Sequence, residues 1–290
     1  MRGNRWVVAL AAAVALGAAA CGVRSDVAAG VEVVASAPFL ADAAERTVDA
    51  GTGRFEMVVT LAGVSEDDVS MTIEGAYDTA AEQATMRADL SGLAGIAGAG
   101  GAAGAALGGT TELVVDGTTF YMRLPALADA AGQEWVSFDA GALGAAGSPM
   151  PAGGLDPRVV LDLLHGSGDV ETVGAEDVRD VATTHLRATL SVDDLAASVP
   201  AEQRAALQPM LDSLQASGTL HPFPLDVWVD GAGLVRRVAL TYTVPAGAVP
   251  GASAGGDVGV TVSADYFDFG EPVEIVVPDP SDVATIPGGD

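Results

Sequence analysis

Apolar and polar residues alternate with a period of two along several short segments, and this is the clearest pattern in the chain. The first three segments are 55–61, 71–77 and 84–90. Such alternation is typical of antiparallel strands that have one dry face and one wet face. A hairpin is predicted over 113–122, because an Asp-Gly pair at its centre favours a tight turn, and a further short strand is predicted over 134–139.

The second half of the chain continues this pattern, with helical segments inserted between groups of strands. Strands are predicted at 169–178, 181–190, 223–230, 234–244 and 258–269. Apolar residues at helical spacing predict helices at 38–50, 156–165, 192–199 and 202–217. Groups of strands separated by helices indicate the α+β class rather than alternating βαβ units.

A sheet of about ten twisted strands tends to curl. We therefore expect a single large curved antiparallel sheet, a half-barrel, wrapped over two or three helices and enclosing an apolar cavity. This domain is expected to cover 38–278, followed by a loose tail at 279–290. The stretch 91–110 is too rich in glycine for a stable helix, which leaves a flexible hairpin loop or a mobile apolar flap at the cavity mouth.

The first 20 residues have the features of a secretory signal peptide. Arg2 and Arg5 form a basic start, residues 6–20 are apolar or small, and Cys21, the only cysteine, follows. Cys21 could be a chance residue, or the run could stay in place as an anchor, although a spanning helix needs roughly 20 residues. The favoured interpretation is removal of 1–20 and acylation of Cys21. Residues 21–37 are then a lipidated tether, although Ala18 departs from the usual lipobox.

The strongly acidic composition limits the possible partners. The chain has 39 Asp and Glu residues against 13 basic ones, all of them arginine, and a net charge of −26. Such a body is repelled by phosphate backbones and by anionic lipid headgroups, which excludes nucleic acid as a partner. Attachment to a membrane would therefore depend on acyl chains. The absence of lysine is typical of a GC-rich genome and hints at an actinobacterial source.

No arrangement of residues indicates catalysis, a metal or a cofactor. Ser253 lies in a G-x-S-x-G match, but a nucleophile elbow needs a strand before it and a helix after it, whereas this segment connects two predicted strands. His165, His185 and His221 are far apart in sequence, and none has a partner at metal-ligand spacing. Without lysine there is no Walker A lysine and no Schiff base. The sequence therefore predicts a protein that is not an enzyme.

The candidate binding residues are apolar. Four of the seven methionines fall on the predicted dry face of the first strands. Methionine is flexible and recurs on surfaces that adapt to varied apolar partners, although an ordinary core would have the same pattern. The residues predicted to line a lipid cavity are Phe55, Met57, Val59, Met71, Ile73, Met86, Phe120 and Met122.

Several segments resemble a known protein family. They are the exported start at Cys21, the helix leading into 50–56, the Thr-Thr-His strand within 177–188, and the Asp-x-x-Gly-Leu-Val-Arg-Arg hairpin within 224–237. Together they are similar to the actinobacterial lipid-carrier lipoproteins of the LppX, LprA, LprF and LprG type, whose fold is like that of LolA and LolB. The resemblance implies a half-barrel with a cavity for the acyl chains of envelope lipids, and it supplies no catalytic residues.

Two functions are compatible with these features. The first is a lipoprotein anchored through Cys21 at the outer face of the cell membrane, which binds an acylated lipid, glycolipid or lipoprotein as a carrier or chaperone. The alternative is an envelope interaction or sensor lipoprotein that has a filled core and binds a protein partner. A cavity large enough for an acyl chain distinguishes the first from the second.

Overall fold

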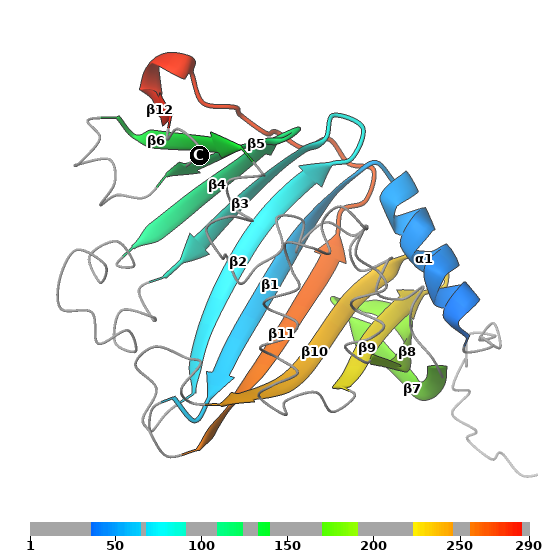
Figure 1. Ribbon diagram of the computed structural model, residues 1–290. Coiled ribbons are helices and arrows are strands. Elements are labelled where there is room, and N and C mark those ends of the chain that lie inside the picture. Colours follow the sequence, from blue (N-terminus) through cyan, green and yellow to red (C-terminus); the bar gives the residue numbers. More distant parts are fainter. Residues whose placement is uncertain are drawn as a thin grey trace, which may run out of the picture. The chain divides into compact units, whose positions relative to one another are not determined.

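The alternating segments form one sheet of twelve strands in the order β12-β6-β5-β4-β3-β2-β1-β11-β10-β9-β8-β7 (Figure 1). The computed structural model describes residues 36–64, 68–90, 109–123, 133–139, 170–190, 223–245 and 256–285. The strands are β1 (Thr52–Ala62), β2 (Val69–Asp78), β3 (Gln83–Asp89), β4 (Thr110–Asp116), β5 (Thr119–Arg123), β6 (Trp135–Asp139), β7 (Val170–Val178), β8 (Val181–Leu190), β9 (Phe223–Asp230), β10 (Val235–Pro245), β11 (Asp257–Phe267) and β12 (Val283–Thr285).

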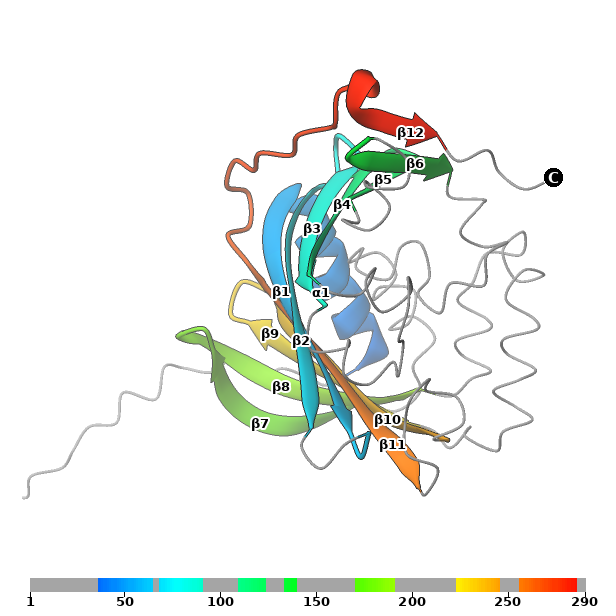
Figure 2. The ribbon, with the colours of Figure 1, turned by 90° about the vertical axis from the view of Figure 1, so that its left-hand side faces the viewer.

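The predicted fold class is confirmed. The strands pair antiparallel except for β12, which runs parallel to β6. Figure 2 shows the sheet curving, with the helix α1 (Ala37–Asp49) on one side of it. The other predicted helices and the Gly- and Ala-rich stretch 91–108 lie outside the described residues.

Helix α1 begins and ends where its sequence directs. The Ser36 side chain accepts a hydrogen bond from the backbone N–H of Phe39, which caps the first turn, and Pro38 lies within that turn. Gly51, with φ of +83°, follows the helix and turns the chain into β1. Leu40, Ala43 and Ala44 are buried in the same apolar cluster as residues of β8, β9 and β10. We call the sheet face against which α1 packs the inner face, and the opposite one the outer face.

One buried hydroxyl joins α1 to the sheet. Thr47 is 1% exposed, and its Oγ1 donates to the carbonyl oxygen of Ala43 at 2.7 Å. The same Oγ1 accepts a hydrogen bond from the backbone N–H of Val235, at the start of β10, at 2.9 Å. The sheet is irregular there, because the pairing of β10 with β9 shifts register between Val235 and Arg237. Thr47 therefore supplies a partner for a buried N–H next to a bulge.

The C-terminal segment corrects one expectation. The sequence predicts a loose tail from 279, but Pro280–Asp282 forms a 3-10 turn and Val283–Thr285 forms β12 beside β6. Asp279 caps the turn by accepting hydrogen bonds from the backbone N–H and hydroxyl of Ser281, and these bonds lower the pKa of Asp279 below its usual value. The amide of Gln133 donates to the carbonyl oxygen of Ser281 at 3.1 Å. A three-residue strand is too short for alternation to reveal it.

The Thr47 hydroxyl provides a test of helix docking. Replacing Thr47 with Val keeps the shape but leaves the buried N–H of Val235 without this partner, so we expect the free energy of unfolding to fall by about 1–3 kcal/mol. Thr47→Ser keeps the hydroxyl and is expected to lose less. Denaturant unfolding followed by circular dichroism measures both changes, and equal stability of the Val variant and the native protein would contradict this account.

Candidate functional site

The inner face is a continuous apolar surface built by the register of the strands. Met57 of β1 lies opposite Ile73 of β2 and Ala264 of β11, and Ala264 lies opposite Val238 of β10. Val227 of β9 then connects Val238 with Leu186 of β8. Because successive side chains of a strand point to opposite faces, these pairs carry the apolar series from β2 across to β8.

The structure places all eight sequence-predicted residues on this face. Phe55, Met57, Ile73 and Phe120 are buried, with exposures of 2%, 4%, 7% and 5%. The other four, Val59, Met71, Met86 and Met122, are only partly buried. The register joins them, because Val59 lies opposite Met71, Gly75 opposite Met86, and Leu113 of β4 opposite both Met86 and Met122. Their role as cavity lining stays a prediction.

Two aromatic rings lie over glycines on the inner face. Phe55 is directly opposite Gly75, and Tyr77 is directly opposite Gly53. A Cβ added to Gly75 would overlap the ring of Phe55 and the carbonyl oxygen of Thr85, and one added to Gly53 would overlap the ring of Tyr77. Glycine in a strand permits such close approach. The rings of Phe55 and Tyr77 therefore lie directly on the neighbouring strands, because the glycines opposite them have no side chain.

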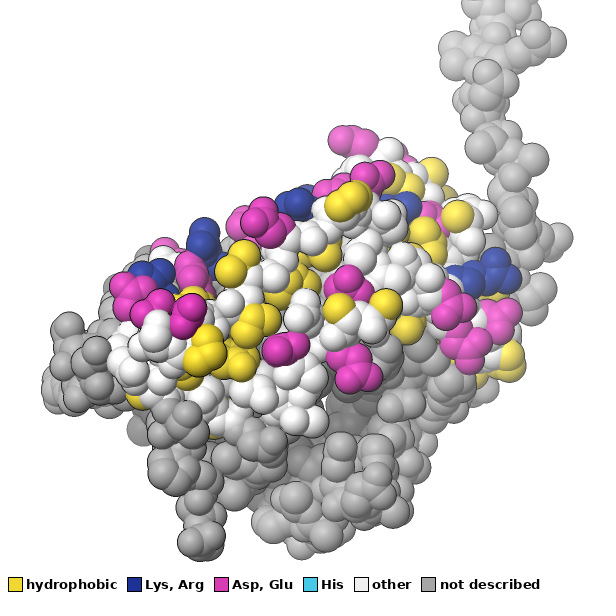
Figure 3. All heavy atoms as spheres, turned by 90° about the horizontal axis from the view of Figure 1, so that it is seen from above, with side chains coloured by type: hydrophobic (Ala, Val, Ile, Leu, Met, Phe, Trp, Pro, Cys, Tyr) yellow, Lys and Arg dark blue, Asp and Glu magenta, His cyan; other side chains and the backbone are white. Residues whose placement is uncertain are grey.

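Charged side chains lie on the other face. On β1 to β5, β8, β9 and β11, the register puts every described charged side chain on the outer face. Some form ion-pair ladders across strands, such as Arg87 with Glu112 at 2.6 Å and Arg123 with Glu112 at 3.7 Å. Basic and acidic side chains lie next to one another in the view of Figure 3. On those strands the inner face thus offers a ligand apolar, glycine, threonine and tyrosine side chains and no charge.

His185 belongs to a cluster on the outer face of β8 and β9, as its place in the alternation predicts. Its ring stacks on Trp228 at 4.1 Å between centroids, and its Nε2 lies 2.7 Å from Oδ1 of Asp226. Asp226 also accepts a hydrogen bond from Arg187 at 2.8 Å, which raises the pKa of the Arg187 guanidinium. The indole N–H of Trp228 donates to Glu176 at 2.8 Å. Because every group is engaged within the cluster, we assign it a structural role.

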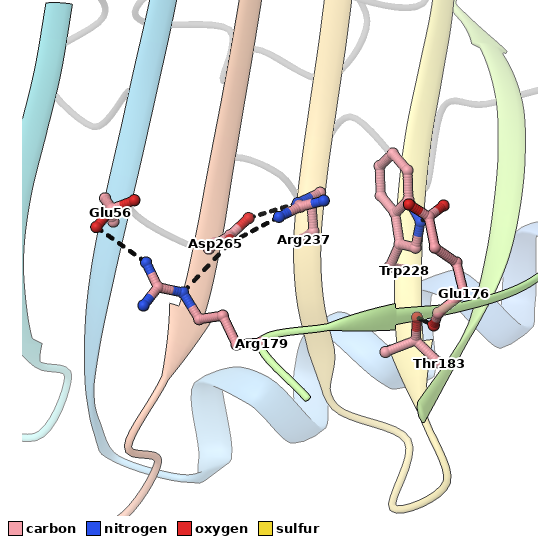
Figure 4. Close-up of polar contacts among 7 residues, drawn as sticks. All are labelled: Glu56, Glu176, Arg179, Thr183, Trp228, Arg237 and Asp265. Carbon is pink, nitrogen blue, oxygen red and sulfur yellow. Dashed lines mark hydrogen bonds and ion pairs between the residues drawn. The ribbon is translucent and has the colours of Figure 1, made fainter. Parts of the chain in front are cut away.

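A second outer-face cluster was not predicted from the sequence. Arg237 of β10 donates twice to Asp265 of β11, at 2.5 and 2.8 Å, and this raises the pKa of the Arg237 guanidinium. Arg179, in the turn between β7 and β8, donates to the same Asp265 at 3.2 Å and pairs with Glu56 of β1 at 3.0 Å (Figure 4). The sequence contains these charged residues, but the contacts between them depend on the order of the strands in the sheet and could not be predicted from it.

A pocket of about 290 Å³ lies beside the β7–β8 turn. It is lined by Val178, Arg179, Val181, Arg236, Tyr266, Phe267 and Asp268. The two arginines are already engaged, since Arg236 pairs with Asp230 at 2.7 Å and its guanidinium lies over the ring of Phe269. None of the residues that line this pocket is among the eight predicted to line the apolar cavity.

The remaining sequence candidates fall outside the described residues. These are Cys21, Ser253, His165 and His221. Within the described segments, no group of three or more His, Cys, Asp or Glu side chains could hold a metal ion. No helix in those segments is long and apolar enough to cross a membrane.

The similarities found for this chain are to solved structures. No protein-family model matches the sequence, and no curated protein matches it. Among solved structures, the chain is similar to the lipoprotein LppX of Mycobacterium tuberculosis, with 15% identity, a TM-score of 0.41, and coverage of 83% of this chain and 100% of LppX. LprF of Mycobacterium bovis is 15% identical, with a TM-score of 0.39 and coverage of 84% of this chain and 96% of LprF. A LolA superfamily protein of Nitrosomonas europaea is 10% identical, with a TM-score of 0.30 and coverage of 81% of this chain and 93% of that protein.

LppX and LprF are two of the lipoproteins that the sequence resembles. The function has to be argued from the residues of this chain.

The glycine–aromatic pairs on the inner face can be tested by substitution. We expect Gly75→Ala to lower the free energy of unfolding by about 1–3 kcal/mol, because the new methyl group displaces the Phe55 ring or the backbone. Gly174→Ala on β7 is the matched control, since nothing lies within 4 Å of a Cβ at that position. Equal stability of the two variants in denaturant unfolding would show that the ring does not need the glycine.

Proposed function

We propose that this protein is an exported, lipid-anchored envelope lipoprotein whose inner face binds the acyl chains of lipids, glycolipids or lipoproteins. It would act as a carrier or chaperone, without catalysis. The observation that carries the proposal is the separation of the two faces of the sheet. Apolar side chains follow one face from strand to strand, and ion pairs occupy the other.

A curved surface that carries no charged side chain on β1 to β5, β8, β9 and β11 is suited to hydrocarbon. Burial of each methylene of an acyl chain contributes about 0.8 kcal/mol, so a long chain gains much from leaving water without any polar contact. Val59, Met71 and Met86 pack against the core and yet remain partly accessible. Methionine adapts its shape to irregular apolar partners, which favours a site that accepts chains of different form.

The N-terminal features support an envelope location. Cys21 follows a basic start and a short apolar run, as in exported lipoproteins. A net charge of −26 disfavours adsorption to an anionic membrane surface. A covalently attached lipid would overcome that repulsion and hold the inner face near the membrane that supplies its ligand.

Binding on the inner face can be tested with two adjacent residues of β2. We expect Met71→Glu to lower affinity for stearoyl lysophosphatidylcholine by at least about tenfold, because an ionised carboxylate loses its hydration beside an acyl chain. Thr72→Glu introduces the same charge at an exposed position on the outer face and should leave affinity unchanged. Native mass spectrometry and fluorescence titration measure the binding, and circular dichroism verifies folding.

Two results of that experiment would contradict the proposal. One is equal loss of binding in both variants. The other is a native protein that has no co-purified lipid and takes up none of the added lipid, which would favour the alternative of a filled core that binds a protein partner.

Anchoring through Cys21 has its own test in the producing cell. Cys21→Ala removes the only thiol in the chain, so we expect the protein to move from the membrane fraction to the soluble fraction and to lose labelling by a radioactive fatty acid. Cell fractionation with the native protein as control measures the change. Persistence of membrane association and of the label in the variant would refute acylation at this residue.

A further inference from the structure

The turn between β7 and β8 reaches strands that are not its neighbours. In the sheet order, β9 and β10 lie between β8 and β11, and β1 lies beyond β11. Arg179 in this turn nevertheless contacts Asp265 on β11 and Glu56 on β1. Adjacent strands are about 4.8 Å apart, so a hairpin lying flat in the sheet could not span that gap. The hairpin instead bends back across the outer face, as Figure 4 shows.

The turn itself favours other residues than the ones it contains. Arg179 and Asp180 have φ of +49° and +63°. Two successive residues of positive φ are typical of a tight hairpin turn, in which Asn and Gly are preferred. A larger side chain in this conformation costs free energy. The contacts of Arg179 with its two carboxylate partners and with the ring of Phe267 offset this cost. The guanidinium lies 4.1 Å from the centroid of that ring.

The tip of the hairpin is also packed against the sheet. Val178, just before the turn, is 1% exposed, and Thr183, just after it, is 5% exposed. The Thr183 hydroxyl donates to the carbonyl oxygen of Glu176 at 2.5 Å, and the Glu176 carboxylate accepts the indole N–H of Trp228 on β9. The tip is therefore fixed to β9, β11 and β1 together.

The other end of the same hairpin belongs to the inner-face core. Leu186 and Ala188 of β8 are fully buried in it, and Val170 of β7 packs against it. The hairpin thus runs from the apolar face at one end to the outer face at the other. A shift of its tip would be transmitted to the side of the apolar surface through the paired strands.

We propose that Arg179 is a positioning residue that, through Asp265 and Glu56, holds the β7–β8 hairpin as a lateral wall of the inner face and thereby determines which apolar chains that face retains. This inference rests on the proposed function. A fixed wall favours chains that fit the space it bounds. Release of the tip weakens contacts with short chains more than with long ones, which make contacts elsewhere on the face.

The test compares Arg179→Asn with Arg54→Asn in the full chain. Asn tolerates positive φ, so the first variant keeps the turn and removes the guanidinium. Arg54 is an outer-face arginine of β1 that pairs with Asp268 at 3.6 Å and does not contact the hairpin in any described ion pair, which makes it the control. The readouts are hydrogen exchange of residues 170–190 without ligand, and affinities for lauroyl and stearoyl lysophosphatidylcholine.

For Arg179→Asn we expect faster exchange in 170–190 and a rise of about threefold or more in the preference for stearoyl over lauroyl chains. Arg54→Asn should alter neither quantity. Glu56→Gln removes only one of the two carboxylate partners and should shift both readouts less, in the same direction. This variant keeps the inference testable if Arg179→Asn does not fold. An unchanged preference in both Arg179→Asn and Glu56→Gln, even with faster exchange, would overturn the inference. A native protein that binds neither probe would instead contradict the proposed function.

Discussion

Strand register is the constraint on which the rest of this structure depends. A β-strand sends successive side chains to opposite faces, so a slip of one residue would exchange the two faces completely. From β2 to β8 the pairing keeps the apolar series together, and at Phe55 and Tyr77 it also sets each ring over a glycine on the neighbouring strand. The register therefore creates both the apolar surface and the close packing of these two rings on it.

The two faces have complementary roles in this account. The inner face packs against α1 and is proposed to bind hydrocarbon. The outer face holds arginines in contact with carboxylates, and the acids outnumber the bases in the chain by 39 to 13. Isolated surface ion pairs contribute little to stability. The pairs around Asp265 differ, because this carboxylate is largely buried and joins β10, β11 and the distant β7–β8 turn.

Sequence patterns predicted most strands to within a few residues, and the reason is local. The alternation of 55–61, 71–77 and 84–90 lies inside β1, β2 and β3 or ends one residue beyond, because one buried face imposes a period of two over the whole strand. Alternation did not predict β12, because this strand has only three residues. The contacts of Arg179 could not be predicted from the sequence for another reason. They depend on which strands become neighbours and on the bending of the hairpin. Cys21 and the cavity-lining role of the eight apolar residues stay predictions.

The central claim is that hydrocarbon binds the inner face. Its most direct test is photo-crosslinking of the native protein with a fatty acid that carries a diazirine on its chain, followed by mapping of the labelled residues by mass spectrometry. The account predicts label on inner-face positions such as Val59, Met71 and Met86, reduced by competition with an unlabelled fatty acid. Label confined to outer-face positions such as Thr72 or Glu74, or label that competition does not reduce, would contradict it.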